Sequence, residues 1–564
     1  MAKILYIYNR GKSINSTITK RVQLICEELT PDNIKSKPEI HSFENVIYGL
    51  ISPNSTITRN NKNILLGNLF GQDIDWEKSG TNPDGNFAIF RCNNNKIEVV
   101  TDCLGTRAIW YYMDENVFIA STSQVAIIKY LNNFEFDDQI IPWMLSNGSL
   151  GPISSWDKRL KKMPGDACLT LNTNEWTLTK KVIPVSFEPL KESKEVIKSA
   201  LENCLIATFK TMEINLKKWA VTLSGGHDSR AILLLLKKYS KLKSSSINTI
   251  TWGIKKSLED NASDINVAQI VAKAIDTNHK TVFTEKKDEN IENIIKRFLI
   301  NGEGRIDHIT GYLDGFLIWK NIYERGIEGI IRGDEVFGYN KIYSPLIIRS
   351  FMGLNLCKDF NNLKKYQFIN ELNQNIPEYL QKANNESLST WKDRIFQLYR
   401  IPYIQSSLAD LKYPYIEQIN PFLSRKIIYF TRKMPDKFRE DKKLFKEIMK
   451  EYDIDIPYSK RDSNASLKEV LHELTWVNLI KSELTSPYAQ NIFPKEFLES
   501  VLNNIKIRRN GTKKKTFSQQ IKQMIPNKYK RLFFQRNVKL NLDENLLAFR
   551  MLIIIRMHKK LKEK

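Results

Sequence analysis

One short segment constrains the fold of this chain more than any other: SGGHDS, at residues 224–229. The apolar run WAVTL precedes it, as in a buried strand, and RAILLLLKKY follows it with the length and composition of a helix. A loop that joins a parallel strand to a helix brings free backbone N–H groups and the positive end of the helix dipole to one point. The segment therefore predicts an anion-binding loop within a parallel α/β domain.

The residue types in this loop suit a polyphosphate. Gly225 and Gly226 let a phosphate approach the backbone, while Ser224 and Ser229 add hydroxyl donors. Asp228 would repel a bare phosphate, so its presence predicts a Mg²⁺ ion between the carboxylate and the polyanion. The loop lacks the GxxxxGK[ST] layout and is not a Walker loop. The alternative is a glycine-containing turn without a ligand, and the flanking strand and helix argue against it.

The chain changes character near its first third. Residues 1–185 are rich in short strand-like runs such as KILYIY, GNFAIF and NVFIAST, separated by Asn, Asp and Gly. From Glu192 onward, long segments have helical spacing and alternate with the strand-like runs KKWAVTL and INTITW. We predict a β-rich domain over residues 1–185, a parallel α/β domain over 190–505, and a basic C-terminal extension over 506–564.

The net charge of +23 is concentrated at the C-terminal end. Residues 506–564 hold 18 Lys and Arg against three acidic residues, which is +15 of that total. Basic and aromatic residues interleave there, so an anionic partner such as RNA, an acidic peptide or a membrane surface is one interpretation. A helical extension with a solvated basic face is the other.

The remaining composition excludes several classes of protein. The six cysteines have neither metal-ligand nor redox spacing, and the N-terminus lacks the layout of a secretory signal. The apolar runs at 231–236 and 551–557 are much shorter than the roughly 20 residues of a membrane span. We expect a cytoplasmic protein.

Several segments, in one consistent order, resemble the asparagine synthetase family. SGGHDS resembles the pyrophosphate-binding loop of the ATP pyrophosphatases, and GNFAIF with TDCLGTRAIWYY resembles the amidotransferase domain of that family. The other matching segments are TWG (251–253), SDINVAQIVAKAIDTNH (263–279), IRGDEVFGY (331–339), INPFLSRKIIYF (419–430) and KKLFK (442–446).

The resemblance implies a fold and a reaction. The fold would be an amidohydrolase-like αββα sandwich, followed by an adenine-nucleotide α-hydrolase-like parallel α/β domain with helical additions. The protein would be an asparagine synthase-type ligase that uses ATP and Mg²⁺. ATP would activate a carboxylate as an acyl-adenylate with loss of pyrophosphate, and ammonia or an amine would then form the amide and release AMP.

The resemblance also implies roles for individual residues. Lys442 would stabilise the adenylate transition state, with Lys443 as a one-residue alternative, and Glu335 is the neighbouring acid. Asp228 and Asp334 would carry Mg²⁺. The implied nucleotide contacts are Leu223, Ser224, Gly225, Gly226, Asp228, Ser229, Trp252, Gly253 and Gly333. A histidine occurs at the family's position as His279, where a purely structural role is equally compatible.

The chain departs from the glutamine-hydrolysing members of the family. Ala2 stands where they carry a nucleophilic cysteine, and Cys26 lies in a helix-like stretch where a core role is expected. Their Asn-Gly-Glu glutamine-binding strand becomes residues 66–68, Leu-Gly-Asn, although Asp102 is kept. Without a thiolate, a thioester route to ammonia is closed. We therefore expect the first domain to keep its fold without glutaminase activity.

Two further departures concern the substrate. Residues 330–333 (IIRG) replace the family's GEGx, so Asp334 could stand for either the missing acid or the metal ligand, and Ser424 replaces the aspartate of PFLD. Aspartate with free ammonia remains possible, as does a larger amine-bearing substrate of the kind used by beta-lactam synthetases and the macrolactam-forming cyclases of lasso peptides. A tRNA-modifying ATP pyrophosphatase and a non-catalytic ATP-binding regulator are the remaining alternatives, and the first-domain motifs argue against the former.

Overall fold

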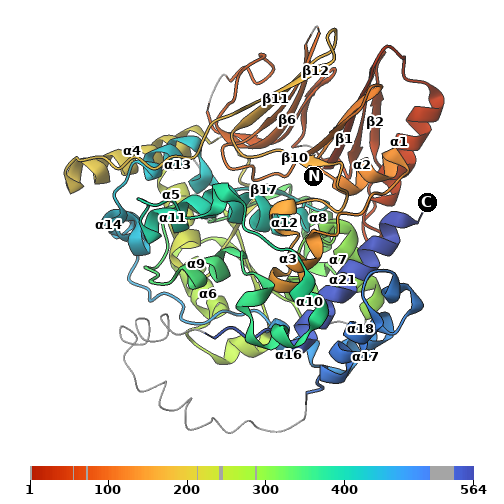
Figure 1. The fold of residues 1–564 in the computed structure, drawn as a ribbon. Helices are drawn as coiled ribbons and strands as arrows, with labels where there is room; N and C mark the ends of the chain where they lie inside the picture. The colour runs from red at the N-terminus through yellow and green to blue at the C-terminus, as the bar shows by residue number, and fades with distance from the viewer. Residues whose placement is uncertain are drawn as a thin grey trace.

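The computed structural model contains two antiparallel sheets followed by a parallel one (Figure 1). The structure describes residues 3–54, 56–71, 74–93, 95–212, 214–239, 246–285, 289–508 and 539–563. The expected mixed α/β fold, a two-sheet sandwich followed by a parallel α/β domain, is confirmed. Ala2 lies outside the described residues.

The first sheet has the strand order β10-β8-β9-β1-β3-β2, and neighbouring strands are antiparallel. Its strands are β1 (Lys3–Asn9), β2 (Glu39–Ser42), β3 (Val46–Ile51), β8 (Trp110–Met113), β9 (Val117–Ser121) and β10 (Lys161–Lys162). Helices α1 (Ser16–Glu28) and α2 (Gln124–Leu131) pack against one face of this sheet. Cys26 of α1 is buried in that core, as its apolar helical setting predicts.

The second sheet has the order β12-β11-β7-β6-β5-β4 and is also antiparallel. Its strands are β4 (Thr58–Asn60), β5 (Asn63–Leu69), β6 (Gly85–Asn93), β7 (Lys96–Thr101), β11 (Ala167–Asn172) and β12 (Thr177–Val182). Alternate residues of both sheets meet in one apolar core, where Tyr6 and Phe90 stack with ring centroids 5.6 Å apart.

The third sheet is parallel and has the order β15-β14-β13-β16-β17. It consists of β13 (Trp219–Thr222), β14 (Asn248–Gly253), β15 (Asn278–Phe283), β16 (Gly329–Ile331) and β17 (Glu417–Ile419). The chain adds strands on one side of β13 and then on the other, which makes β13 the switch point of the sheet. Loops that leave the carboxyl ends of strands at a switch point form the usual ligand crevice of such sheets.

Helices surround this sheet and connect its strands. Between β12 and β16 they are α4 (Lys194–Thr211), α5 (His227–Tyr239), α6 (Asp264–Ile275), α7 (Ile291–Gly302) and α8 (Leu317–Glu324). Later helices include α9 (Pro345–Met352), α10 (Gln367–Glu371), α11 (Leu388–Ile395), a π-helical stretch (Phe396–Gln405), α12 (Ser406–Asp410), α13 (Arg425–Arg432), α14 (Asp436–Arg439), α15 (Lys443–Met449), α16 (Leu467–Leu471), α17 (Leu474–Leu484) and α18 (Lys495–Asn504).

The C-terminal part of the predicted extension is a core helix. Helix α21 (Glu544–Lys562) packs against α17, α18 and α3 (Ile140–Asn147), and Figure 1 shows it in blue among these elements. Arg550 donates to Asp307 Oδ2 at 2.7 Å and to the Leu145 carbonyl at 2.8 Å. Nine of the 18 basic residues lie in 509–538, so the predicted anionic contact there falls outside the described residues. Within the described ranges, no helix is both long and apolar enough to cross a membrane.

Buried polar contacts join the first domain to the parallel sheet. Arg107 donates to Glu417 of β17 at 2.7 Å, and Asn86 accepts from the Asn420 backbone at 2.7 Å. The carboxylate of Asp84 accepts from the Ser424 hydroxyl and from the Arg425 N–H at the start of α13. An acid of the first domain thus caps the helix next to the position where PFLD would supply its own aspartate.

Candidate active site

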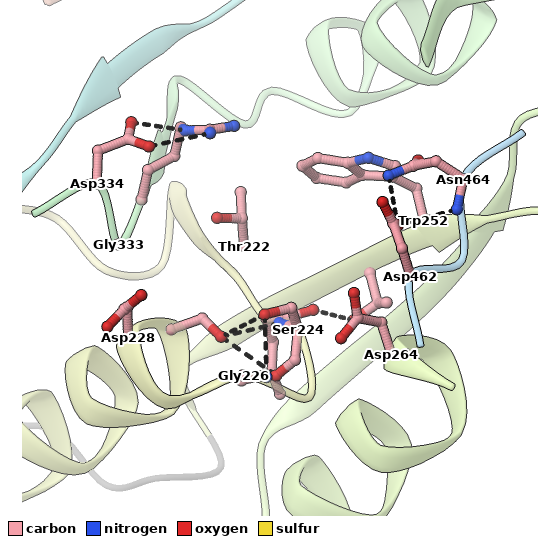
Figure 2. A pocket seen from close by; sticks show the side chains of 14 residues that line it. Thr222, Ser224, Gly226, Asp228, Trp252, Asp264, Gly333, Asp334, Asp462 and Asn464 are labelled. Carbon is pink, nitrogen blue, oxygen red and sulfur yellow. Dashed lines mark hydrogen bonds and ion pairs between the residues drawn. The ribbon is translucent and has the colours of Figure 1, made fainter. Parts of the chain in front are cut away.

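A cavity of about 250 Å³ opens at the carboxyl ends of β13, β14 and β16, where the sheet topology predicts a ligand (Figure 2). We call it the first cavity. Its lining residues are Thr222, Leu223, Ser224, Gly226, Asp228, Ser229, Thr251, Trp252, Asp264, Arg332, Gly333, Asp334, Asp462 and Asn464. Eight of them are residues that the sequence predicts as nucleotide or metal contacts.

The loop at 224–229 is held open by its own serines. The Ser229 hydroxyl accepts from the Ser224 N–H at 3.0 Å and lies 3.0 Å from the Ser224 hydroxyl. The Gly226 N–H donates to Ser224 Oγ at 3.2 Å. A side chain at Gly226 would meet only that hydroxyl within 4 Å, so this part of the backbone is open to a ligand. The geometry is that of an anion cradle at the start of α5.

Gly225 and Gly253 do not line the first cavity, although both were predicted to contact the nucleotide. Instead they admit residues 459–464, which we call the closing segment. A Cβ on Gly225 would lie 2.5 Å from Ser459 Cβ, and one on Gly253 would lie 2.5 Å from Ser463 Cβ. Ser459 N–H donates to the Gly225 carbonyl at 2.9 Å. These two glycines therefore position the segment that brings further polar side chains to the cavity.

The sequence alone did not identify these further side chains. Asp462 and Asn464 come from the closing segment, and Asp264 comes from the first turn of α6, where it accepts from the Ser459 hydroxyl. Arg332 completes this set, and only its place two residues before Asp334 could have drawn attention to it. The polar cluster RDSN at 461–464 was the other available signal.

Lys442 joins the loop to Glu335. Its Nζ lies 2.6 Å from Asp228 Oδ2 and 3.0 Å from Glu335 Oε1. Burial would lower the pKa of Lys442, but the charges of Glu335 and Asp228 raise it above its ordinary value, so the ammonium stays charged. The structure thus brings Lys442 to the loop, whereas Lys443 is exposed at the start of α15.

Glu335 is the second acid beside a single ammonium group. It is 2% exposed and also accepts from the Phe337 N–H. Burial raises its pKa to about 7, the charge of Asp228 acts in the same direction, and Lys442 opposes both. One cation therefore serves two carboxylates, and Glu335 is the carboxylate that takes up a proton.

The backbone at Lys442 is held in an uncommon conformation. Asp441 and Lys442 have φ values of +58° and +56°, in the left-handed region that ordinary side chains rarely occupy. Two such residues in succession turn the chain sharply before α15 begins. This turn aims the lysine back toward the loop, and strained residues of this kind concentrate at functional sites.

A second cavity of about 230 Å³ lies on the other side of Asp228. It is lined by His227, Asp228, Gly338, Tyr339, Asn340, Asp441, Lys442 and Lys446. His227 stacks on Tyr458 with centroids 3.5 Å apart, and burial together with the nearby lysines lowers its pKa, which favours the neutral ring. Asp228 lines both cavities, so a group bound in one lies next to a group bound in the other.

The two predicted metal ligands differ in availability. Asp228 Oδ1 is buried without a hydrogen-bond partner, so the donor set fits a cation there. Both oxygens of Asp334 accept from Arg332, Oδ2 from Nε at 3.1 Å and Oδ1 from Nη2 at 3.3 Å. The structure thus offers Asp228 as a ligand for Mg²⁺ and leaves Asp334 engaged with an arginine.

Two aromatic positions in this domain have different surroundings. Trp252 lines the first cavity and packs edge-on against Trp319, with centroids 5.4 Å apart. His279 lies on β15, where its ring nitrogens face Thr249 Oγ1 at 2.9 Å and Thr281 Oγ1 at 3.3 Å. Burial lowers the pKa of His279. Its contacts are those of a structural histidine.

The first domain places its family-like residues in closed surroundings. Asp102 Oδ1 accepts from the Leu104 and Thr106 N–H groups, and Oδ2 accepts from the Phe87 N–H and the Thr106 hydroxyl. A Cβ on Gly67 would lie 2.2 Å from the Asn86 carbonyl oxygen. Burial raises the pKa of the Cys26 thiol to about 12, which opposes formation of a thiolate.

Comparisons with known proteins agree with part of this description. Residues 214–407 match the family model described as Asparagine synthase. No curated protein matches the chain. The U34-tRNA thiolase NcsA from Methanococcus maripaludis with its [4Fe-4S] cluster has 14% identity and a TM-score of 0.24, over 59% of this chain and 93% of that chain.

Two further solved structures are similar to parts of this chain. The glutamine phosphoribosylpyrophosphate amidotransferase from B. subtilis, complexed with ADP and GMP, has 10% identity and a TM-score of 0.20, over 60% of this chain and 83% of that chain. The allosteric regulatory enzyme of purine biosynthesis has 9% identity and a TM-score of 0.20, over 62% of this chain and 77% of that chain. At these TM-scores, no inference about fold or function follows from the three likenesses.

The second domain thus combines a parallel sheet, an anion cradle at its switch point and a lysine that bridges two acids. Within that domain, residues 214–407 match the family model of asparagine synthase, which supports an ATP-using ligase.

Proposed function

We propose that this protein forms an amide by activating a carboxylate as an acyl-adenylate, with release of pyrophosphate and AMP. One observation carries the proposal: Asp228 lies between two cavities, and Lys442 is 2.6 Å from it. A nucleotide in the first cavity and a carboxylate in the second would meet beside a fixed ammonium group. Such a group stabilises negative charge that develops at the transferred phosphorus and the leaving pyrophosphate.

Each part of the site would have a separate task. The open backbone at Gly226 and the hydroxyls of Ser224 and Ser229 would hold the leaving pyrophosphate. Trp252 would pack against the base, and Asp228 would hold Mg²⁺, which lowers the repulsion between the carboxylate and the polyphosphate. Glu335 would keep Lys442 oriented without neutralising it.

We further propose that the first domain has lost glutaminase activity. Asp102 is satisfied by four donors of its own domain, and no cysteine occurs at position 2. The nitrogen would therefore come from free ammonia or from an amine already present in a substrate. The two proposed substrates are aspartate, with ammonia as the nitrogen source, and a peptide whose own amine closes a ring.

The test supplies purified protein with Mg-ATP and aspartate, and adds ammonium or glutamine in separate reactions. Pyrophosphate, AMP and asparagine are followed by mass spectrometry, with Lys442→Ala and Lys443→Ala as a matched pair. Asparagine formed with ammonium alone identifies an ammonia-dependent synthetase, and Lys442→Ala should lower its rate by about 10²–10³-fold.

Asparagine formed from glutamine would overturn the proposed loss of glutaminase. If no carboxylate from a panel of amino acids and peptides supports pyrophosphate release, the ligase proposal itself fails. Equal effects of the two lysine variants would remove Lys442 from the chemistry.

A further inference from the structure

We infer that Arg332 supplies to the bound polyphosphate the positive charge that a second divalent ion at Asp334 would otherwise supply, so that the site takes one metal ion for each nucleotide. The inference rests on the proposed function only in placing a nucleotide in the first cavity.

Arg332 is held at the cavity by its neighbours on both sides. It follows β16 directly, and its N–H donates to the Ile419 carbonyl at 2.8 Å. Gly333, the next residue, packs so closely on the loop at 224–229 that a Cβ on Gly333 would lie 3.0 Å from Ser229 N. Figure 2 shows Gly333 and Asp334 above Asp228, across the cavity from Asp264 and Asp462. Arg332 lines this cavity together with Ser224 and Ser229 of the loop.

The arginine also removes a ligand from any metal. Its Nε and Nη2 donate to the two oxygens of Asp334, which is the side-on pairing typical of arginine with a carboxylate. Burial opposes the charge on Arg332, but Asp334 raises its pKa above the ordinary value. A cation that approached Asp334 would meet this guanidinium before it met a free carboxylate oxygen.

One carboxylate oxygen of Asp228 has no hydrogen-bond partner. Asp228 Oδ2 is taken by Lys442, and Asp228 Oδ1 is buried with no hydrogen-bond partner. Among the residues that the structure describes, no three His, Cys, Asp or Glu side chains gather closely enough to hold a metal themselves. Mg²⁺ is commonly held by one or two carboxylates together with substrate phosphates, so Asp228 and the nucleotide suffice for one ion.

Arg332 can contact a phosphate without leaving Asp334. A guanidinium has five N–H donors, and the Asp334 pairing uses Nε and one Nη2 donor, which leaves the remaining donors for an anion. Asp334 then acts as a positioning residue for the arginine. Lys442, which contacts Asp228, and Arg332, which lines the first cavity, would provide two fixed cations near a polyphosphate that carries a single metal ion.

The experiment measures Mn²⁺ bound to the full chain by electron paramagnetic resonance, with α,β-methylene-ATP as the nucleotide. We expect one Mn²⁺ per bound nucleotide in the wild type. Arg332→Met frees Asp334, so a second Mn²⁺ should bind, and the nucleotide affinity at limiting Mn²⁺ should fall by about 10- to 100-fold. Arg332→Met with Asp334→Asn should return the count to one.

Controls separate the possible failures. Arg332→Lys keeps the charge, so it should retain one Mn²⁺ per nucleotide and lose less affinity than Arg332→Met. Two Mn²⁺ ions in the wild type, or an unchanged nucleotide affinity in a folded Arg332→Met protein, would overturn the inference. A wild type that binds no nucleotide would instead overturn the proposed function. Thermal unfolding establishes that each variant is folded.

Discussion

Each of the two domains has an aspartate that the sequence singles out, Asp102 and Asp228, and the two carboxylates have opposite surroundings. Asp102, after β7, accepts four hydrogen bonds from its own domain. Asp228, in the first turn of α5, lines two cavities; one of its oxygens accepts from Lys442, and the other is buried without a hydrogen-bond partner. Because buried polar atoms in folded proteins are usually paired, an unpaired carboxylate oxygen on a residue that lines a cavity is available to a cation.

The difference extends to the residues around each aspartate. Asn86 and Arg107 of the first domain contact the second domain, so they hold the two domains together. In the second domain, one lysine serves two acids, and the imbalance raises the pKa of Glu335 to about 7. The first domain thus uses its family-like polar residues for stability, and the second keeps them available for chemistry.

The largest expected effect concerns Lys442. Lys442→Met leaves Asp228 and Glu335 without their shared cation, which should lower the free energy of unfolding by about 3–5 kcal/mol. The matched variant Lys443→Met removes an exposed lysine and should change it by less than about 0.5 kcal/mol. Chemical denaturation measures both. Equal stability of the two variants would contradict the coupling of Lys442 to Asp228 and Glu335.

The next largest effect is the dependence of the free energy of unfolding on pH. Glu335 has an ordinary pKa of 4.5 when unfolded and about 7 when folded, so between these values the folded state binds one more proton. The free energy of unfolding should therefore fall as pH rises from 4.5 to 7, with this group contributing up to about 1.4 kcal/mol per pH unit.

Glu335→Gln removes this contribution. Subtracting the curve of the variant from that of the wild type, both measured by urea denaturation, isolates it. A difference that does not change across this range of pH would mean that Glu335 is ionised throughout.

A smaller effect is expected in the first domain. Asp102→Asn replaces an acceptor oxygen by an amide group that faces N–H donors, which should cost about 1–3 kcal/mol of stability. Affinity for α,β-methylene-ATP, measured by calorimetry, should not change. Asp138→Asn, on the exposed surface of the same domain, is the control and should alter neither quantity. A loss of nucleotide affinity in Asp102→Asn but not in Asp138→Asn would contradict a purely stabilising role of Asp102.

The smallest effect concerns the closing segment. In Gly253→Ala the new methyl group would overlap Ser463 and displace residues 459–464, so affinity for α,β-methylene-ATP should fall by about tenfold. Gly311→Ala is the matched control, because nothing lies within 4 Å of a Cβ at that position. If the two variants bind equally well, the closing segment has no part in binding.

Local sequence patterns were enough to predict the loop and its surroundings. The run DINVAQIVAKAI is α6 to the residue, and the strand, loop and helix around residues 224–229 form as expected. The sequence predicts Lys442, Asp228 and Glu335 as separate site residues, and the structure shows Lys442 in contact with both acids. These predictions needed only periodicity and the resemblance of short motifs.

Other features depend on contacts between distant segments, which no local pattern records. Arg332 and Asp462 reach one cavity from segments 130 positions apart, and the pairing of Arg332 with Asp334 changes what the predicted metal site can hold. The basic composition of residues 506–564 concealed a buried helix, because Arg550, Arg556 and the lysines of its last turn are interspersed with the buried Leu, Ile and Met residues of α21.

The packing of α21 on α3 has a consequence for how the chain folds. Arg550 donates to a carbonyl 405 positions earlier, at Leu145. A ribosome adds about 5–20 residues per second, so roughly 20–80 s separate the synthesis of these two partners. Throughout that interval the side of α3 that receives α21 stays uncovered. A contact between residues so far apart in the sequence also slows folding after the chain leaves the ribosome. The first domain is therefore synthesised early but finishes its packing late.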